Sequence, residues 1–175
     1  MKRSSDMENE GVLQIACAMV VAARTAPKTR GIDNIEVIVI DDEPSKDKVR
    51  EVMAKISKDE NRPSFERDAN SIKMCPAIVA IGVKAIPAGL NCGFCGYGTC
   101  DKLKKSGGIC AYNSIDLGIA VSSAASCASD CRADNRVMYS IGRACLDLKL
   151  FTHDVKQALG IPLSVTGKSP FFDRK

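Results

Sequence analysis

The chain has 175 residues, of which 45% are hydrophobic and 26% are charged, a composition that predicts one folded domain covering 1–175. The formal net charge of +4 is small and dispersed, and the chain has no Trp, so we expect no nucleic-acid partner. The apolar run at 12–23 follows several acids and is too short to span a bilayer, which argues against a signal peptide or a membrane anchor. We therefore expect a protein of the reducing cytoplasm.

The first half of the chain predicts alternating helices and strands. A helix is expected from Glu10 to Ala26, where acids precede an Ala-, Val- and Met-rich run that Pro27 ends. This run is apolar nearly all round, so we expect the helix to be buried. The β-branched run at 35–40 predicts a strand, and the following charge spacing predicts helices at 45–58 and 64–73.

The second half predicts the remaining elements around a cysteine-rich loop. A buried strand is expected at 76–83, and a loop at 88–112 separates it from two helices rich in small residues at 114–129 and 135–150. A last strand is expected at 161–167. The order of elements predicts an α+β fold (α/β-like), with a central sheet, helices on both faces and the 88–112 loop as an insertion.

Four cysteines within this loop predict an iron–sulfur site. They follow the pattern C-x2-C-x4-C-x9-C and are Cys92, Cys95, Cys100 and Cys110. A [4Fe–4S] cluster needs four thiolates, and its sulfides accept hydrogen bonds. The glycines at 93, 96 and 98 suit both needs, because a residue without a Cβ can adopt positive φ and bring its backbone N–H close to a sulfide.

Three other interpretations of the cysteines stay open at this point. A structural zinc site commonly has two C-x2-C pairs, and only one is present here. A disulfide framework fits poorly with nine cysteines, an odd number. Chance burial of four thiols would leave the glycines unexplained. Cys75, just before Pro76, is the alternative fourth ligand if Cys110 does not serve.

The segment 91–100 resembles the C-G-x-C-G-x-x-x-C motif of small [4Fe–4S] domains in anaerobic electron-transfer proteins. Together with this motif, further segments resemble a family of bacterial and archaeal ferredoxin domain-containing proteins; they lie at 22–28, 31–34, 116–120, 134–136, 160–164 and 167–174. The resemblance covers nearly the whole chain.

That family is in turn distantly similar to the FMN-dependent nitroreductases. The segment 116–120 is similar to a core helix of that fold, and 24–28 lies where nitroreductases carry a basic segment that holds the FMN phosphate. The resemblance implies a nitroreductase-like fold, a homodimer with flavin at the subunit interface, and Arg24, Thr25 and Lys28 as FMN phosphate ligands. The usual arginine–serine pattern of that segment is not reproduced here.

We therefore expect an iron–sulfur redox protein that transfers single electrons, with FMN as a second cofactor and a flavin-assisted reductase activity as its enzymatic form. Its partner is a redox protein or a small-molecule electron acceptor. The alternatives are a non-enzymatic module with a structural or sensing cluster, and a zinc-stabilised scaffold. Lysines 102, 104 and 105 either dock an acidic partner or simply solubilise the loop.

Overall fold

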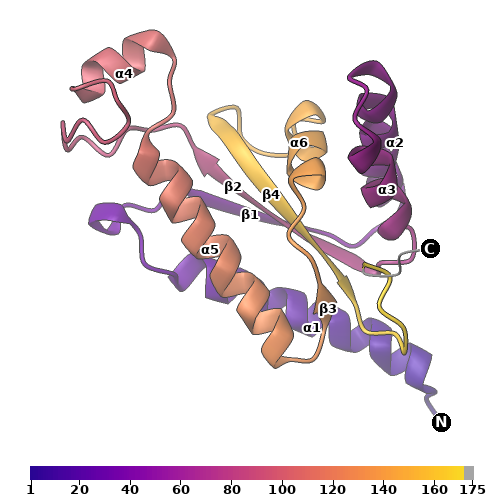
Figure 1. The fold of residues 1–175 in the computed structure, drawn as a ribbon. Helices are drawn as coiled ribbons and strands as arrows, with labels where there is room; N and C mark the ends of the chain where they lie inside the picture. The colour runs from indigo at the N-terminus through magenta and orange to yellow at the C-terminus, as the bar shows by residue number, and fades with distance from the viewer. Residues whose placement is uncertain (172–175) are drawn as a thin grey trace.

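The computed structural model describes residues 1–171, which build a four-stranded antiparallel sheet with helices on both faces (Figure 1). In spatial order the strands are β1 (Ile35–Ile40), β2 (Ala77–Lys84), β4 (Val155–Ser164) and β3 (Asp134–Asn135). In the register, Ala80 of β2 lies opposite Ile38 on one side and Gly160 on the other. The predicted α+β class with a central sheet is therefore confirmed.

Each face of the sheet has its own hydrophobic core. Helices α1 (Ser4–Thr25) and α5 (Ala111–Asp130) cover one face, and α2 (Glu43–Asp59), α3 (Pro63–Ser71) and α6 (Tyr139–Asp147) pack on the other. Successive side chains of a strand point to opposite faces. In β2, Val79 and Ile81 enter the α1–α5 core, whereas Ile78 and Ala80 enter the other core.

Small residues let α1 and α5 lie close together. Ala120, Ala124 and Ala128 of α5 recur every fourth residue and are buried, and the Ser123 hydroxyl donates to the Ala22 carbonyl at 3.0 Å. The expectation that the first helix is wholly buried was wrong. Only one side of α1 is buried, and Val21 is 62% exposed, because no second layer covers the outer side of α1 in residues 1–171.

Several boundaries differ from the prediction: α1 begins at Ser4, six residues before the predicted start, and the last strand ends at Ser164 instead of 167. Strand β4 begins at Val155, six residues before the predicted start, because the adjacent polar residues Lys156 and Gln157 interrupt the apolar pattern of its first part. The predicted helix at 135–150 is divided: Asn135 pairs with Leu163, Met138 bridges Gly160, and helix α6 starts only at Tyr139. Cross-strand pairing therefore takes precedence over helix propensity at the start of this segment.

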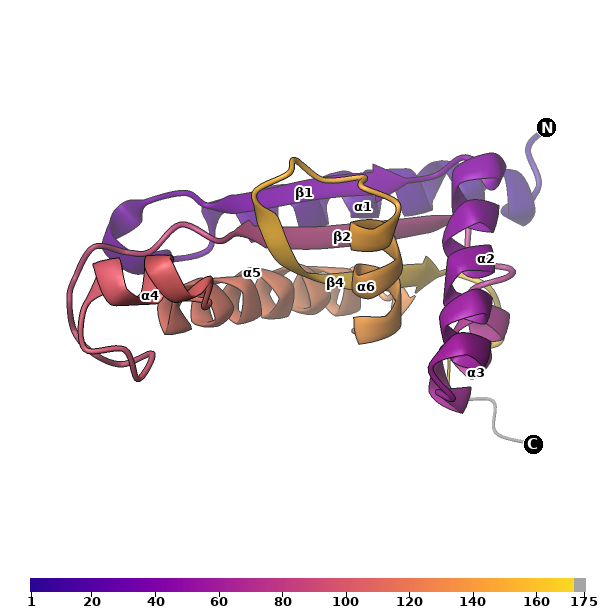
Figure 2. The ribbon, with the colours of Figure 1, turned by 90° about the horizontal axis from the view of Figure 1, so that it is seen from above.

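The 85–110 segment projects from one end of the sheet, and α2 and α3 lie at the other end (Figure 2). This segment contains a short helix that the sequence did not predict, α4 (Cys100–Ser106). A 3-10 helix, η1 (Thr29–Gly31), follows α1 near the end of the sheet from which the 85–110 segment projects. None of the helices within residues 1–171 is long and apolar enough to cross a membrane. Residues 172–174, part of the segments that carry the family resemblance, lie outside the described residues.

Candidate metal centre

The loop between β2 and α4 is tightly coiled by residues with positive φ. These residues are Gly89, Asn91, Gly93, Gly96 and Gly98. Few side chains tolerate this left-handed region, and glycine adopts it without strain from a Cβ. The Gly96 N–H donates to the Gly93 carbonyl at 2.8 Å, which closes a turn that contains Cys95.

Two polar side chains fix the end of the loop. The Asn91 Oδ1 atom accepts a hydrogen bond from the Cys100 N–H at 2.9 Å, so the residue before the first cysteine is tied to the third cysteine. Thr99 caps α4, because its hydroxyl accepts from the Lys102 N–H at 3.3 Å. Gly107 then ends α4 with a φ of 69°, and the chain returns to Cys110.

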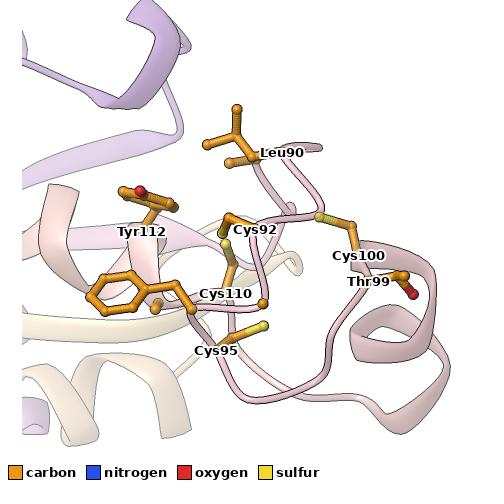
Figure 3. A pocket seen from close by; sticks show the side chains of 11 residues that line it. Leu90, Cys92, Cys95, Thr99, Cys100, Cys110 and Tyr112 are labelled. Carbon is orange, nitrogen blue, oxygen red and sulfur yellow. The ribbon is translucent and has the colours of Figure 1, made fainter.

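Cys92, Cys95, Cys100 and Cys110 line one apolar cavity at the mouth of this loop. In Figure 3 the side chains of Cys95 and Cys100 point across the space that the loop encloses, whereas that of Cys92 points to the other side, where Cys110 lies. Cys110 is buried, Cys95 and Cys100 are half-buried, and Cys92 is exposed. Cys110 is the N-cap residue of α5, so the long helix fixes the position of its sulfur.

These donors fit an iron–sulfur cluster. Four thiols around a small apolar space, with a backbone coiled by left-handed glycines, match what such a cluster requires of its protein. Within residues 1–171, no three His, Cys, Asp or Glu side chains are grouped closely enough to hold one metal ion. The four thiols therefore share a cavity without converging on one point, which is compatible with a cluster because each thiolate would bind a different iron.

A small hydrophobic cluster supports the cavity from behind. Leu103 of α4 is fully buried and packs with Ala88 and Cys110. Gly108 is required here, because a Cβ would lie 2.7 Å from the Leu103 side chain and 3.0 Å from the Tyr97 ring. Sequence reasoning missed Leu103 and Gly108, although Leu103 is the one large apolar residue among the lysines of α4.

Beside the cavity, a hydrogen-bonded clasp joins three distant segments. The Asp116 carboxylate, buried in α5, accepts from the Thr29 backbone N–H at 3.0 Å and from its hydroxyl at 2.9 Å. The next residue, Arg30, has a φ of 59° and donates from its guanidinium to the Ala88 carbonyl at 2.9 Å. Asn113 donates to the Ile86 carbonyl at 3.0 Å, so α5 holds both sides of the clasp. An Asp within the apolar part of α5 was the sequence signal for this clasp.

A second hollow, the α5–α6 groove, starts one helical turn after Cys110. One part, of about 370 Å³, lies between Ser114, Leu117 and Gly118 of α5 and the facing residues of α6 and β4. It continues into a second part of about 570 Å³ beside the 149–156 segment, since both parts share Arg143, Leu146 and Lys156. A Cβ added at Gly118 would meet no atom within 4 Å, so this wall of the groove is open.

The residues predicted to hold an FMN phosphate are engaged within the turn after α1. The Arg24 guanidinium contacts the Ile35 carbonyl and the Asp33 carboxylate. Lys28 donates to the carbonyls of Arg24 at 2.6 Å and Ala26 at 2.8 Å, and the Thr25 hydroxyl donates to Val21 at 2.8 Å. None of these three residues lines the α5–α6 groove. Their role as phosphate ligands stays a prediction.

The other cysteines lie away from the cavity. Cys75 and Cys145 are buried in the core between the sheet and helices α2, α3 and α6, and burial raises the pKa of each thiol to about 12. Cys75 precedes β2 at the end remote from the loop, and Cys75 does not line the cavity. Cys127 and Cys131 lie at the end of α5, where burial, followed by the neighbouring Cys131, raises the pKa of Cys127.

Comparison of the sequence with known proteins identifies relatives of this chain. A protein of Archaeoglobus fulgidus, described as an uncharacterized protein, is 40% identical over 178 residues, which cover 97% of this chain and 95% of that protein. The family model described as "Uncharacterized protein containing a ferredoxin domain (DUF2148)" matches residues 106–174. The chain belongs to this ferredoxin-domain family. Its model includes Cys110 and the clasp residues of α5, and begins after the first three loop cysteines.

Solved structures show the fold of this ferredoxin-domain protein. A nitroreductase with bound FMN from Bacteroides fragilis superposes with a TM-score of 0.64 at 10% identity, covering 93% of this chain and 81% of that chain. A nitroreductase with bound FMN from Desulfitobacterium hafniense gives a TM-score of 0.63 at 14% identity, covering 89% and 78%. A BluB-like flavoprotein from Clostridium difficile gives 0.63 at 16% identity, covering 87% and 80%. The predicted nitroreductase-like fold is therefore confirmed.

Proposed function

We propose that Cys92, Cys95, Cys100 and Cys110 hold a [4Fe–4S] cluster and that the protein transfers single electrons. The observation that carries this proposal is the single apolar cavity lined by all four thiols. When bound, the cluster supplies one-electron chemistry, and the protein sets its potential through hydrogen bonds, burial and nearby charge. The ferredoxin-domain family supports the same conclusion.

The residues around the cavity would control that chemistry in distinct ways. The left-handed glycines leave backbone N–H groups close to the site, where they can donate to sulfides. Leu103 and Ala88 exclude water from the Cys110 side, while the exposed Cys92 faces solvent. The nearby Arg30 cation stabilises negative charge at the cavity, because it is hydrogen-bonded to Ala88, which lines the cavity.

We also propose that FMN binds in the α5–α6 groove. Its two parts have volumes in the range of ligand sites, and the absence of a side chain at Gly118 suits a flat ring. Leu117 and Ala158 give apolar walls, and Lys156 places a cation at the rim. Ser114 is about 6 Å along the helix axis from Cys110, so the two cofactors would lie close enough to exchange electrons. FMN-bound neighbours of the same fold support this proposal.

The protein is further proposed to act as a homodimer. Ile115 and Ile119 of α5 and Leu13 and Val21 of α1 are exposed apolar side chains on the two helices that cover one face. Exposed apolar surface of this kind is typical of an association site. Light scattering of the anaerobic protein tests this part, and a monomeric mass would contradict it.

Anaerobic metal analysis tests the proposed cluster directly. We expect about four iron atoms and four sulfides per chain, an EPR signal after dithionite, and loss of both iron and signal in Cys110→Ser. Cys145→Ser, which alters a buried core thiol, serves as the matched control. Zinc alone would refute the cluster and establish the zinc scaffold. An iron–sulfur protein with no flavin absorbance and no acceptor reductase activity would establish the structural or sensing module.

A further inference from the structure

Exposed apolar side chains surround the mouth of the thiol-lined cavity. Leu90 is 42% exposed, Phe94 is 63% exposed, and both line the cavity beside the cysteines. Phe94 also contacts the Tyr112 ring, with ring centroids 5.7 Å apart, so it is held in place although it is exposed. The loop therefore presents ordered apolar groups to solvent at the point where Cys92 is also exposed.

A rim of lysines adjoins this apolar mouth. Lys102, Lys104 and Lys105 of α4 are all exposed, and none of them forms an ion pair with an acid of residues 1–171. The segment 85–110 contains one acid, Asp101. Lys104 follows Cys100 by four residues and therefore lies on the same side of the helix as this cysteine, whereas Lys102 and Lys105 lie on the sides of α4 turned away from it. Lys104 thus places positive charge next to the apolar mouth, and the other two lysines extend this charge around α4.

This combination matches a particular class of partner. Transient protein interfaces have an apolar centre with a polar rim, and complementary charge accelerates their formation. We propose that the surface formed by Leu90, Phe94 and the three α4 lysines docks an acidic one-electron carrier protein. The docking proposal depends on the proposed cluster and specifies where electrons enter or leave it. In the step itself, one electron passes between the cluster and the carrier's redox centre, and no bond is made or broken.

The proposal predicts an electrostatically steered reaction. Steering raises association rates ten-fold or more and weakens with ionic strength, because salt screens exposed charges. Replacing the three lysines with glutamine removes the charge and leaves α4 with a residue of similar helix propensity. The buried Leu103 is not altered. The matched control is Lys48, Lys55 and Lys58, three exposed lysines of α2 at the other end of the molecule.

The experiment uses stopped-flow oxidation of the dithionite-reduced holoprotein. The acceptors are an acidic blue-copper protein, a basic cytochrome c and a small neutral quinone. With the acidic acceptor at low salt, we expect the rate constant of Lys102→Gln/Lys104→Gln/Lys105→Gln to fall at least ten-fold and that of Lys48→Gln/Lys55→Gln/Lys58→Gln to stay at the wild-type value. The difference should shrink with added salt, and the rate with the quinone should not change.

The outcomes separate the two proposals. An unchanged rate with the acidic acceptor, or an equal fall with the basic cytochrome, would overturn the docking surface while the cluster still reduces the quinone. A wild-type protein without iron and sulfide would instead overturn the proposed function. A loss of rate with the quinone as well would assign the lysines to cluster integrity, and this too contradicts docking.

Discussion

The open wall of the α5–α6 groove permits a change that blocks the groove without damaging the fold. In Gly118→Leu, the new side chain enters the groove, since a Cβ at this position meets no atom within 4 Å. Gly in a helix interior costs about 0.8–1 kcal/mol relative to Ala, and Leu is nearly as favourable as Ala, so the folded state should gain about 0.8 kcal/mol. For a chain of this length, such a gain raises the Tm by roughly 2–3 °C.

The same substitution should abolish the proposed flavin site. Four added carbon atoms occupy the wall against which a flat ring would lie, and we expect the affinity for FMN to fall at least ten-fold, which corresponds to about 1.4 kcal/mol. Quenching of FMN fluorescence during titration measures the affinity, and thermal denaturation measures the stability. Gly11→Leu on α1 is the matched control, because its Cβ also meets no atom within 4 Å. Unchanged FMN binding in Gly118→Leu, or a lowered Tm, would show that the groove has been misassigned.

Four further predictions concern the loop, the clasp and the core. Leu103→Ala should lower the free energy of local opening of the 88–110 segment by about 2–4 kcal/mol, and should speed the loss of iron to a chelator, because it removes the buried side chain that packs behind Cys110. Arg30→Gln should lower the midpoint potential of the proposed cluster in a redox titration, because a nearby cation favours the reduced form. Arg132→Gln, which alters an exposed arginine, is the control, and equal midpoint potentials in the two variants would contradict this prediction. Asn113→Ala leaves the Ile86 carbonyl without its amide donor and should cost about 1–3 kcal/mol in urea unfolding. The free energy of unfolding should also fall as the pH rises above about 9. The buried Cys145 thiol has a pKa of about 12 and stays protonated in the folded protein, whereas the same thiol ionises in the unfolded chain. A free energy of unfolding that is constant between about pH 8 and 10 would contradict this effect of burial.

The sequence predicted those parts of the fold that depend on local patterns. The β-branched run at 35–40 forms β1 with the predicted bounds, because nearly every residue in it favours a strand. Helix α4 was missed because it has one buried apolar residue, Leu103, and depends instead on the Thr99 cap and the left-handed Gly107. Its neighbours are lysines, which show no apolar periodicity.

The features that depend on distant contacts were beyond local reasoning. Asp116 and Thr29 are 87 residues apart, and only the packing of α5 against the turn after α1 brings them together. The α5–α6 groove is likewise built from segments separated in the chain. The cysteine motif indicated which thiols to consider, and the structure places all four around one cavity, while their role as metal ligands stays a prediction.

The segment that contains the thiol-lined cavity, residues 88–110, buries very few apolar side chains of its own. Its buried cluster consists of Ala88, Leu103 and Cys110, separate from the two large cores that flank the sheet. A segment with so few buried contacts opens at a lower free energy than the sheet. Removal of the proposed cluster should therefore make residues 88–110 the first segment to exchange its amide hydrogens, while β2 remains protected. The supply of iron would then decide whether the proposed docking end of the molecule has a defined shape.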